Sequence, residues 1–416
     1  KILGDRKVLW DSGVMRKGDA ARAFDVDLSG LDKVLLLVEE AGDGIMYDHA
    51  DWLEVKITTR GEVEPLSVWA RPISKGKYIL TPASPETPQI NNPLVYGARP
   101  GNPFLMPVMA SGKRPMAYGA QGLPEGLELD PRTGLITGRV PAEGDFRVLL
   151  TAENALGKAE REILLKIGPQ IALTPPMGWS SWYSYSEAVG QDNVLKTARL
   201  FVERGLVNHG WAYINIDDCW QGRRGGKYGA IQPNKRFPDM KAMCDAIHAM
   251  GMKVGIYSTP WMGTYAGFIG GSAPNAKSDY GEMAIPEKER KQEDQIFGSY
   301  PGVHRRKADH VGAVWLFDRD AKQWADWGFD YVKVDWNPND VPTTKRIRKA
   351  LDESGRDIVL SLSNAAPYEH VEELGKLANL WRTTGDIQDH WGSVSGIGFS
   401  QERWQKHMRP GHWNDP

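Results

Sequence analysis

The order of apolar and polar residues predicts mostly β-structure in the first part of the chain. Short apolar segments there alternate with turns rich in Gly, Pro and Asp, and helical periodicity is scarce. Residues 33–39 are expected to form a buried strand, and residues 53–58 alternate as a half-buried strand does. A Pro-rich stretch at 81–93 predicts a linker, so we expect two β-rich domains, 1–87 and 94–168.

The second of these domains has the turn pattern of a β-sandwich. Between residues 122 and 138, Pro, Gly and Asp fix turns between short apolar strands. This segment is similar to the immunoglobulin-like modules found beside bacterial carbohydrate enzymes. The domain before it faintly resembles the carbohydrate-binding modules that precede such enzymes.

After residue 171 the pattern changes to a regular alternation of strand, loop and helix. Apolar segments predict strands at 177–182, 213–220, 253–260, 330–336, 357–364, 380–387 and 412–416. Helices lie between them, and in two of these the apolar residues share one face before a glycine: Val194, Ala198, Phe201 and Val202 before Gly205, and Met240, Met243, Ile247 and Met250 before Gly251. The alternation predicts a parallel sheet covered by helices. Residues 171–416 are therefore expected to form a (β/α)8 TIM barrel that is incomplete at its C-terminus, because the sequence ends at the seventh strand.

One connection in this barrel, from residue 261 to 318, is far longer than the usual few residues. Its glycines and charges are compatible with a lid over the site and with a poorly ordered excursion. We favour the lid.

Composition excludes several classes of function. Lys and Arg number 51 against 53 Asp and Glu, so the chain has no basic field for nucleic acid, and an uncharged substrate is expected. No apolar run approaches the roughly 20 residues that cross a bilayer, so no membrane insertion is expected. Residues 1–10 lack the apolar core of a signal peptide, which fits a mature chain as well as a cytosolic one. The sequence does not indicate an oligomeric state.

The cysteines and histidines indicate neither a disulfide framework nor a metal centre. Cys219 and Cys244 are expected to be free, buried thiols. The nine His residues are not spaced as metal ligands, so we expect no metal and no cofactor. The 16 Trp and 14 Tyr suit the apolar faces of sugar rings, but aromatic rings also fill cores, and only their positions can distinguish the two roles.

Carboxylates follow several of the predicted strands. Asp217 and Asp218 end the second strand, Asp335 the fourth, Asp386 the sixth and Asp415 the seventh. Any one of them could cap a helix or build a turn. The active site of a parallel barrel lies at the carboxyl ends of its strands, and crowded like charges cost free energy unless a ligand or cation uses them. Together these residues predict a site at this rim.

Two of these carboxyl groups suit glycoside hydrolysis, which needs one group to attack or activate water and another to protonate the leaving oxygen. Asp335 lies two residues after Lys333 on an alternating strand, so the cation is on the same side and favours the ionised, nucleophilic form. Asp386 lies four residues after Arg382. To donate a proton it needs a raised pKa, which burial beside Asp335 could supply.

Six motifs carry a specific resemblance. They lie, in order, at 174–182, 213–220, 253–257, 331–335, 381–386 and 411–416. They resemble the motifs of glycoside hydrolase family 27, the α-galactosidases and α-N-acetylgalactosaminidases. The resemblance implies a retaining double displacement in which Asp335 is the nucleophile and Asp386 is the general acid and then the general base.

The resemblance also implies substrate contacts for neighbouring residues. Trp182 would lie against the apolar face of the sugar, and Tyr257 would line the pocket. Asp217 and Asp218 would accept hydrogen bonds from the 6- and 4-hydroxyls, Lys333 would donate to the 3- and 4-oxygens, and Arg382 would reach the 2-substituent. Paired carboxylates that bind an axial hydroxyl favour galactose over glucose, because a sugar without that hydroxyl leaves buried acceptors unpaired.

The chain departs from the family pattern at two places. Where animal and plant members have a disulfide beside the site, this sequence has Tyr265 and Asn337. Where the α-galactosidases have a Glu after the fifth strand, it has Ser363 followed by Ala366, which resembles the N-acetylgalactosaminidase loop that makes room for an acetamido group.

The leading hypothesis is thus an exo-acting, retaining α-galactosidase, secreted or periplasmic, whose partner is a galactose-containing oligosaccharide or polysaccharide. An α-N-acetylgalactosaminidase or a β-L-arabinopyranosidase with the same machinery is the alternative, although Asp217, suited to a 6-hydroxyl, disfavours the arabinoside. A non-catalytic carbohydrate-binding protein is the second alternative. The presence of both Asp335 and Asp386 disfavours it.

Overall fold

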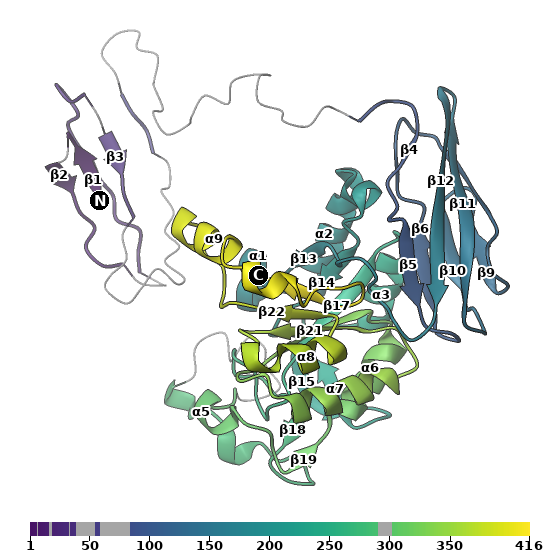
Figure 1. Ribbon diagram of the computed structural model, residues 1–416. Coiled ribbons are helices and arrows are strands. Elements are labelled where there is room, and N and C mark those ends of the chain that lie inside the picture. Colours follow the sequence, from purple (N-terminus) through teal and green to yellow (C-terminus); the bar gives the residue numbers. More distant parts are fainter. Residues whose placement is uncertain (6, 16–18, 33, 39–54, 59–83, 290–301) are drawn as a thin grey trace. The chain divides into compact units, whose positions relative to one another are not determined.

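The computed structural model describes the chain except for residues 6, 16–18, 33, 39–54, 59–83 and 290–301 (Figure 1). The chain forms two compact units, 1–81 and 82–416. In the first unit, β1 (Ile2–Gly4) pairs antiparallel with β2 (Lys7–Trp10) and β3 (Val34–Leu36).

Two expectations for the first unit differ from the structure. Of the strand expected at 33–39, residues 33 and 39 lie outside the described residues, and the described part contains β3, whose side chains are exposed, not buried. Among the residues described in this unit, no strand or helix other than β1 and β2 accompanies β3. Residues 55–58 form no strand, and residues 53–54 lie outside the described residues.

The second unit begins with the β-sandwich expected from the turn pattern. One sheet has the order β5 (Val95–Ala98), β12 (Gly157–Ile167), β11 (Gly144–Asn154) and β8 (Ala117–Gln121), and the other β6 (Phe104–Pro107), β10 (Leu135–Gly138) and β9 (Leu127–Leu129). β4 (Gln89–Ile90) pairs with β7 (Ala110–Ser111). Met106, Ile136 and Leu150 are fully buried between the sheets.

The rest of this unit is built on a seven-stranded sheet in which all neighbours are parallel (Figure 1). Its strands follow the chain order: β13 (Gly178–Ser180), β14 (Tyr213–Asn215), β17 (Lys253–Ser258), β20 (Tyr331–Asp335), β21 (Val359–Ser363), β22 (Leu380–Arg382) and β23 (Trp413–Asp415). All seven predicted strands are present, which confirms the TIM-barrel-like class of fold. The strands are shorter than predicted at their carboxyl ends, and Trp182 begins a helix.

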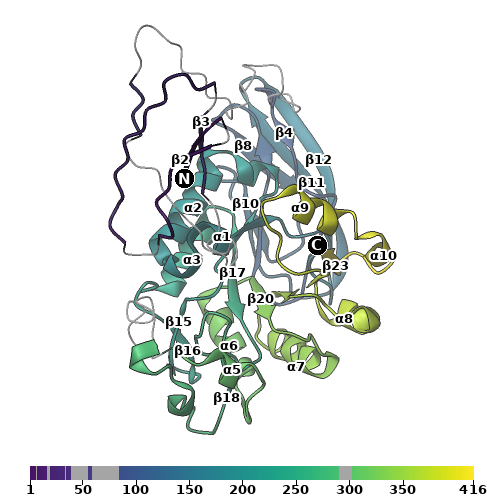
Figure 2. The ribbon, with the colours of Figure 1, turned by 90° about the vertical axis from the view of Figure 1, so that its left-hand side faces the viewer.

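Helices surround this sheet, as the periodicity predicts. The principal ones are α2 (Gln191–Glu203), α3 (Met240–Ala249), α6 (Phe317–Trp327), α7 (Val341–Asp352), α8 (Val371–Leu377) and α9 (Trp391–Gly398). Figure 2 shows α2 and α3 on one side of the strands and α7 and α8 on the other. Val194 and Ala198 of α2 are buried, whereas Val202 is exposed. No helix in the part of the chain that the structure describes is long and apolar enough to cross a membrane.

Shorter elements lie between these strands and helices. They are α1 (Trp182–Tyr185), η1 (Ser186–Ala188), η2 (Leu206–His209), the hairpin of β15 (Gln221–Gly225) and β16 (Ala230–Pro233), η5 (Tyr368–His370) and α10 (Glu402–Gln405). The long connection after β17 contains β18 (Ser272–Ala273), η3 (Gly281–Met283), η4 (Glu287–Glu289), α5 (Arg305–Ala308) and β19 (Val314–Trp315). Its Ile269, Tyr280 and Val303 are buried in the barrel's hydrophobic core, so its described part is packed structure.

A buried ion pair fixes this connection to the barrel. Arg224 of β15 bonds both carboxylate oxygens of Asp320 on α6, at 2.8 and 2.9 Å, and donates to the carbonyl oxygen of Gly270 at 2.6 Å. Asp320 also accepts from the backbone N–H of Ile231. Only 6% of the Arg224 side chain and none of the Asp320 side chain is exposed. The guanidinium therefore joins three segments that are distant in the sequence.

Replacing Arg224 with Met should strongly destabilise the barrel. The substitution leaves the Asp320 charge buried without its cation, a change that costs about 3–5 kcal/mol. Lys227→Met is the matched control, because Lys227 pairs with Asp326 on the surface, where both side chains are largely exposed and a pair contributes at most about 1 kcal/mol. Urea unfolding followed by tryptophan fluorescence measures both. Equal shifts of the midpoint would contradict the assigned role of the buried pair.

The sandwich contacts the barrel at the end opposite to the carboxyl ends of the strands. Asp357, just before β21, accepts from the backbone N–H of Arg99 at 3.0 Å and from the amide of Asn102 at 2.8 Å. Arg99 also pairs with Asp352 at 2.8 Å. The sandwich therefore contacts the barrel at the amino ends of its strands, and the candidate site lies at the other end.

Candidate active site

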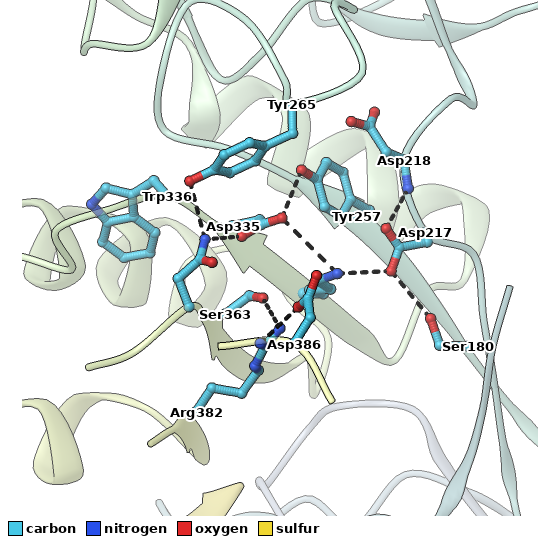
Figure 3. Close-up of polar contacts among 12 residues, drawn as sticks. Ser180, Asp217, Asp218, Tyr257, Tyr265, Asp335, Trp336, Ser363, Arg382 and Asp386 are labelled. Atoms are coloured by element: carbon cyan, nitrogen blue, oxygen red, sulfur yellow. Dashed lines mark hydrogen bonds and ion pairs between the residues drawn. The ribbon is translucent and has the colours of Figure 1, made fainter. Parts of the chain in front are cut away.

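The carboxyl ends of neighbouring strands bring the predicted polar residues together (Figure 3). Asp217 and Asp218 follow β14, Tyr257 lies on β17, Lys333 and Asp335 on β20, Ser363 ends β21 and Arg382 ends β22. Hydrogen bonds and ion pairs link these side chains across adjacent strands, so the cluster predicted from the sequence forms. Trp182, at the start of α1, is half-buried against the barrel core.

Asp335 is nearly buried, with 9% of the residue exposed, and each of its carboxylate oxygens accepts a hydrogen bond. The Tyr257 hydroxyl donates to Oδ2 at 3.0 Å, and the Asn364 amide donates to Oδ1. Lys333 Nζ lies 4.0 Å from Oδ2, on the side expected from the alternation. Burial raises the pKa of Asp335, and the Lys333 charge opposes this rise. The expected effect of Lys333 is thus present, but burial is the larger effect.

Lys333 connects the nucleophile candidate to Asp217. Its Nζ donates to Asp217 Oδ2 at 2.9 Å, and the Ser180 hydroxyl donates to the same oxygen at 3.1 Å. Burial lowers the pKa of Lys333, but the Asp217 and Asp335 charges outweigh this effect and raise it to about 12. The lysine is therefore a fixed cation between two carboxylates.

Asp218 is also buried, and backbone donors hold it in place. The N–H of Cys219 donates to Oδ1 at 2.7 Å, and the N–H of Ala266, in the long connection, donates to Oδ2 at 3.0 Å. Burial nevertheless raises the pKa of Asp218 to about 7. Its charge therefore changes near neutral pH.

Arg382 links Asp386 to Ser363. One guanidinium nitrogen lies 2.7 Å from Asp386 Oδ1, and the other donates to the Ser363 hydroxyl at 3.1 Å. Ala366 is buried beside them, and its N–H bonds the Arg382 carbonyl oxygen. The expectation that Asp386 is buried is wrong, because its side chain is 61% exposed. It lies beyond the end of β22, where Arg382 holds it at the mouth of the site.

The structure adds contacts that the sequence did not assign. The Asn364 amide donates to Asp335 and to the Tyr265 hydroxyl, and the Ser180 hydroxyl donates to Asp217 (Figure 3). Asn364 directly follows β21, and its position at a strand end was the available signal. Tyr265 lies in the long connection, where no periodicity fixes its direction. Within the described ranges, no group of three or more His, Cys, Asp or Glu side chains could hold a metal ion. Cys219 and Cys244 are free and buried, as predicted.

A parallel barrel-type sheet that carries four carboxyl groups, a lysine and an arginine at its carboxyl rim has the arrangement of the (β/α)8 glycoside hydrolases. The family follows from comparison with known proteins. The family described as alpha galactosidase A matches residues 174–284 and 295–416, more than half of the chain, and the chain belongs to this family, glycoside hydrolase family 27. Residues 1–58 match the NPCBM/NEW2 domain, and residues 87–168 match an immunoglobulin-domain family.

Relatives support this assignment. The chain is 32% identical over 278 residues to alpha-galactosidase 2 of Arabidopsis thaliana, which covers 65% of this chain and 59% of the relative. It is also 30% identical over 272 residues to the alpha-N-acetylgalactosaminidase of Gallus gallus. That alignment covers 59% of this chain and 57% of the relative. A crystal structure from Bacteroides fragilis NCTC 9343, assigned by its description to the alpha-galactosidases, is 31% identical with a TM-score of 0.67 and covers 81% of this chain and 67% of that one. The chain thus spans less than two thirds of these two curated relatives.

Proposed function

We propose that the protein is a retaining exo-glycoside hydrolase that removes terminal α-linked galactosyl residues. The observation that carries this proposal is the buried carboxylate of Asp335, held by Tyr257 and Lys333, in one cluster with the Arg382-bound carboxyl of Asp386 (Figure 3). A nucleophile and a second carboxyl group that can donate a proton are the two groups that double displacement at an anomeric carbon needs.

The reaction takes place in two steps. An oxygen of Asp335 attacks the anomeric carbon, the glycosidic C–O bond breaks, and the carboxylic acid of Asp386 gives its proton to the leaving oxygen. In the second step Asp386 takes a proton from water, the water oxygen attacks the same carbon, and the bond to Asp335 breaks. Each step inverts the centre, so the product retains the α configuration.

The charged groups around Lys333 favour galactose. Asp217 and Asp218 are buried acceptors, and Lys333, which donates to Asp217, is a donor beside them. An axial 4-hydroxyl pairs with such groups, whereas an equatorial one leaves a buried acceptor unpaired, which costs about 1–3 kcal/mol. We therefore expect cleavage of the α-galactoside in preference to the α-glucoside.

A second candidate, the α-N-acetylgalactosaminidase, is favoured by the contact between Arg382 and Ser363. Ser363 and Ala366 are small residues at the end of β21 and in the loop after it, and Arg382 is held between the Ser363 hydroxyl and Asp386. An acetamido group at the 2-position would lie against these residues.

A panel of nitrophenyl glycosides tests the proposal. It contains the α-galactoside, the α-N-acetylgalactosaminide, the β-L-arabinopyranoside and the α-glucoside. Release of nitrophenol from the first supports the main proposal, and preferential cleavage of the second supports the alternative. If none is cleaved by the full-length protein, the proposal fails. A fluorinated galactosyl donor should label Asp335 and leave Asp335→Ala unlabelled, whereas a carbohydrate-binding protein without activity would bind sugar and remain unlabelled.

The pH dependence of kcat/KM should reflect Asp218. With a pKa of about 7, this carboxyl is ionised above pH 7 and accepts from a sugar hydroxyl with both oxygens, whereas protonation below pH 7 removes one acceptor. We expect kcat/KM, which reports the free enzyme, to fall as the pH drops below about 7. Hydroxyls of bound sugar favour the ionised form, so the acid limb of kcat should lie at lower pH. If Asp218→Asn keeps the wild-type acid limb of kcat/KM, another group causes it.

A further inference from the structure

The carboxylate of Asp335 has a second set of neighbours, which arrive from two other parts of the barrel. Asn364 follows β21 and donates from its amide nitrogen both to Asp335 Oδ1 and to the hydroxyl of Tyr265, at 3.1 Å in the second case. Tyr265 belongs to the long connection after β17, and its hydroxyl oxygen bonds the same amide nitrogen that donates to Asp335. The three groups form a chain that ends on the nucleophile.

The chemistry of these groups fixes the direction of the chain. An ionised carboxylate only accepts hydrogen bonds, so the amide must turn its NH2 group and not its oxygen toward Asp335. One hydrogen of that group then points to Oδ1, and the other points to the phenol oxygen of Tyr265, which accepts it. A flipped amide would place an oxygen against the carboxylate and would lose that bond, whereas the phenol, which can also donate, would still bond the amide. The carboxylate therefore sets the orientation of the amide, and Tyr265 helps to hold the amide in place.

The backbone of Asn364 supports the same geometry. Its φ of +66° lies in the left-handed region, which Asn and Gly adopt far more readily than other residues. A side chain with a Cβ branch or an apolar end at this position would strain the turn and lose the amide. Asparagine satisfies the backbone requirement and supplies the donor.

We propose that Asn364 and Tyr265 are positioning residues for the nucleophile, with Asn364 acting on Asp335 directly and Tyr265 acting through Asn364. This inference rests on the proposed function. The amide fixes Oδ1 and stabilises the negative charge that the carboxylate carries before attack and regains when the sugar leaves. The Tyr257 hydroxyl does the same for Oδ2. The loop after β21 and the long connection thus tune the reactivity of a residue on β20.

Four variants test the inference. Asn364→Gly keeps the left-handed turn and removes the donor, Asn364→Asp keeps the shape and replaces the donor with a second acceptor, Tyr265→Phe removes the acceptor behind the amide, and the last variant combines Tyr265→Phe with Asn364→Gly. Ala365→Gly is the matched control, because it adds a glycine to the same loop at an exposed position.

Asn364→Gly should lower kcat/KM by about 10- to 100-fold, the range expected for a hydrogen bond to a charged group. With Asp218→Asn in the background, so that Asp218 no longer sets the acid limb, the limb of the kcat/KM profile should move to higher pH in Asn364→Gly, and further still in Asn364→Asp. Tyr265→Phe should have a smaller effect in the same direction, and the double variant should match Asn364→Gly, because the phenol acts through the amide. Ala365→Gly should keep the wild-type profile. If Asn364 and Tyr265 had only a structural role, the acid limb would not shift, and the effects of the two substitutions would add in the double variant.

Carbon-13 NMR of aspartate-labelled protein gives a readout that needs no activity. The Asp335 signal, assigned by its loss in Asp335→Asn, should titrate at higher pH in Asn364→Gly than in the wild type. If the active wild type and Asn364→Gly share one Asp335 titration and one kcat/KM, the inference is overturned. If the wild type cleaves no glycoside but the titration still shifts, the proposed function fails and the contact stands.

Discussion

Asp335→Asn is expected to reduce kcat/KM on the nitrophenyl α-galactoside by about 10⁴-fold or more, because it removes the nucleophile of a covalent mechanism. The amide cannot ionise and its oxygen is a weak nucleophile. It also meets donors on both sides, from Tyr257 and from Asn364, so its NH2 group must face one of them. The loss of activity should occur in a folded protein, since the substitution also removes a buried charge.

Asp340→Asn is the matched control for this experiment. Asp340 lies five residues further along and caps α7, where its side chain accepts from the backbone N–H of Thr343 at 2.7 Å. Asn caps helices about as well as Asp, so activity and stability should stay near the wild-type values. Steady-state kinetics and thermal unfolding measure both variants. Activity of Asp335→Asn within tenfold of the control would exclude Asp335 as the nucleophile.

The strands of the barrel could be predicted from the sequence because each is a short apolar run between polar turns. The residues at which the strands end could not be predicted, because backbone hydrogen bonding to the neighbouring strand, and not composition, determines where a strand ends. The predicted strand at 213–220 stops at Asn215, and Cys219, which was expected to continue it, has a φ of +78°, in the left-handed region outside strand geometry. The same applies to Trp182, which the sequence placed on a strand and the structure places on α1.

The candidate site could be predicted where its residues lie on the same strand. Lys333 and Asp335 share a face because side chains alternate along β20, and the structure places them 4.0 Å apart. Contacts between distant segments were not predictable. Asn364 and Tyr265 are 99 residues apart, and only the packed path of the long connection brings them together. The exposure of Asp386 likewise depends on a loop whose direction no local pattern sets.

Asp386→Ala should impair the reaction to an extent that depends on the leaving group. When a disaccharide is the substrate, its second sugar leaves as an alkoxide unless it receives a proton, so cleavage should slow by about 10²- to 10⁴-fold, the usual contribution of general acid catalysis. A dinitrophenyl galactoside, whose leaving group needs no proton, should form the glycosyl-enzyme at nearly the wild-type rate. Its turnover should then be limited by the second step, in which water has lost its base.

Azide separates these two roles of Asp386. As an anionic nucleophile it needs no general base, so it should restore turnover of the dinitrophenyl substrate in Asp386→Ala and yield the α-galactosyl azide. Asp389→Ala is the control, because Asp389 lies three residues further on the same loop and is exposed. An equal loss on all substrates, with no response to azide, would mean that Asp386 only orients Arg382, with which it pairs at 2.7 Å. The proton donor would then have to be sought elsewhere on the rim.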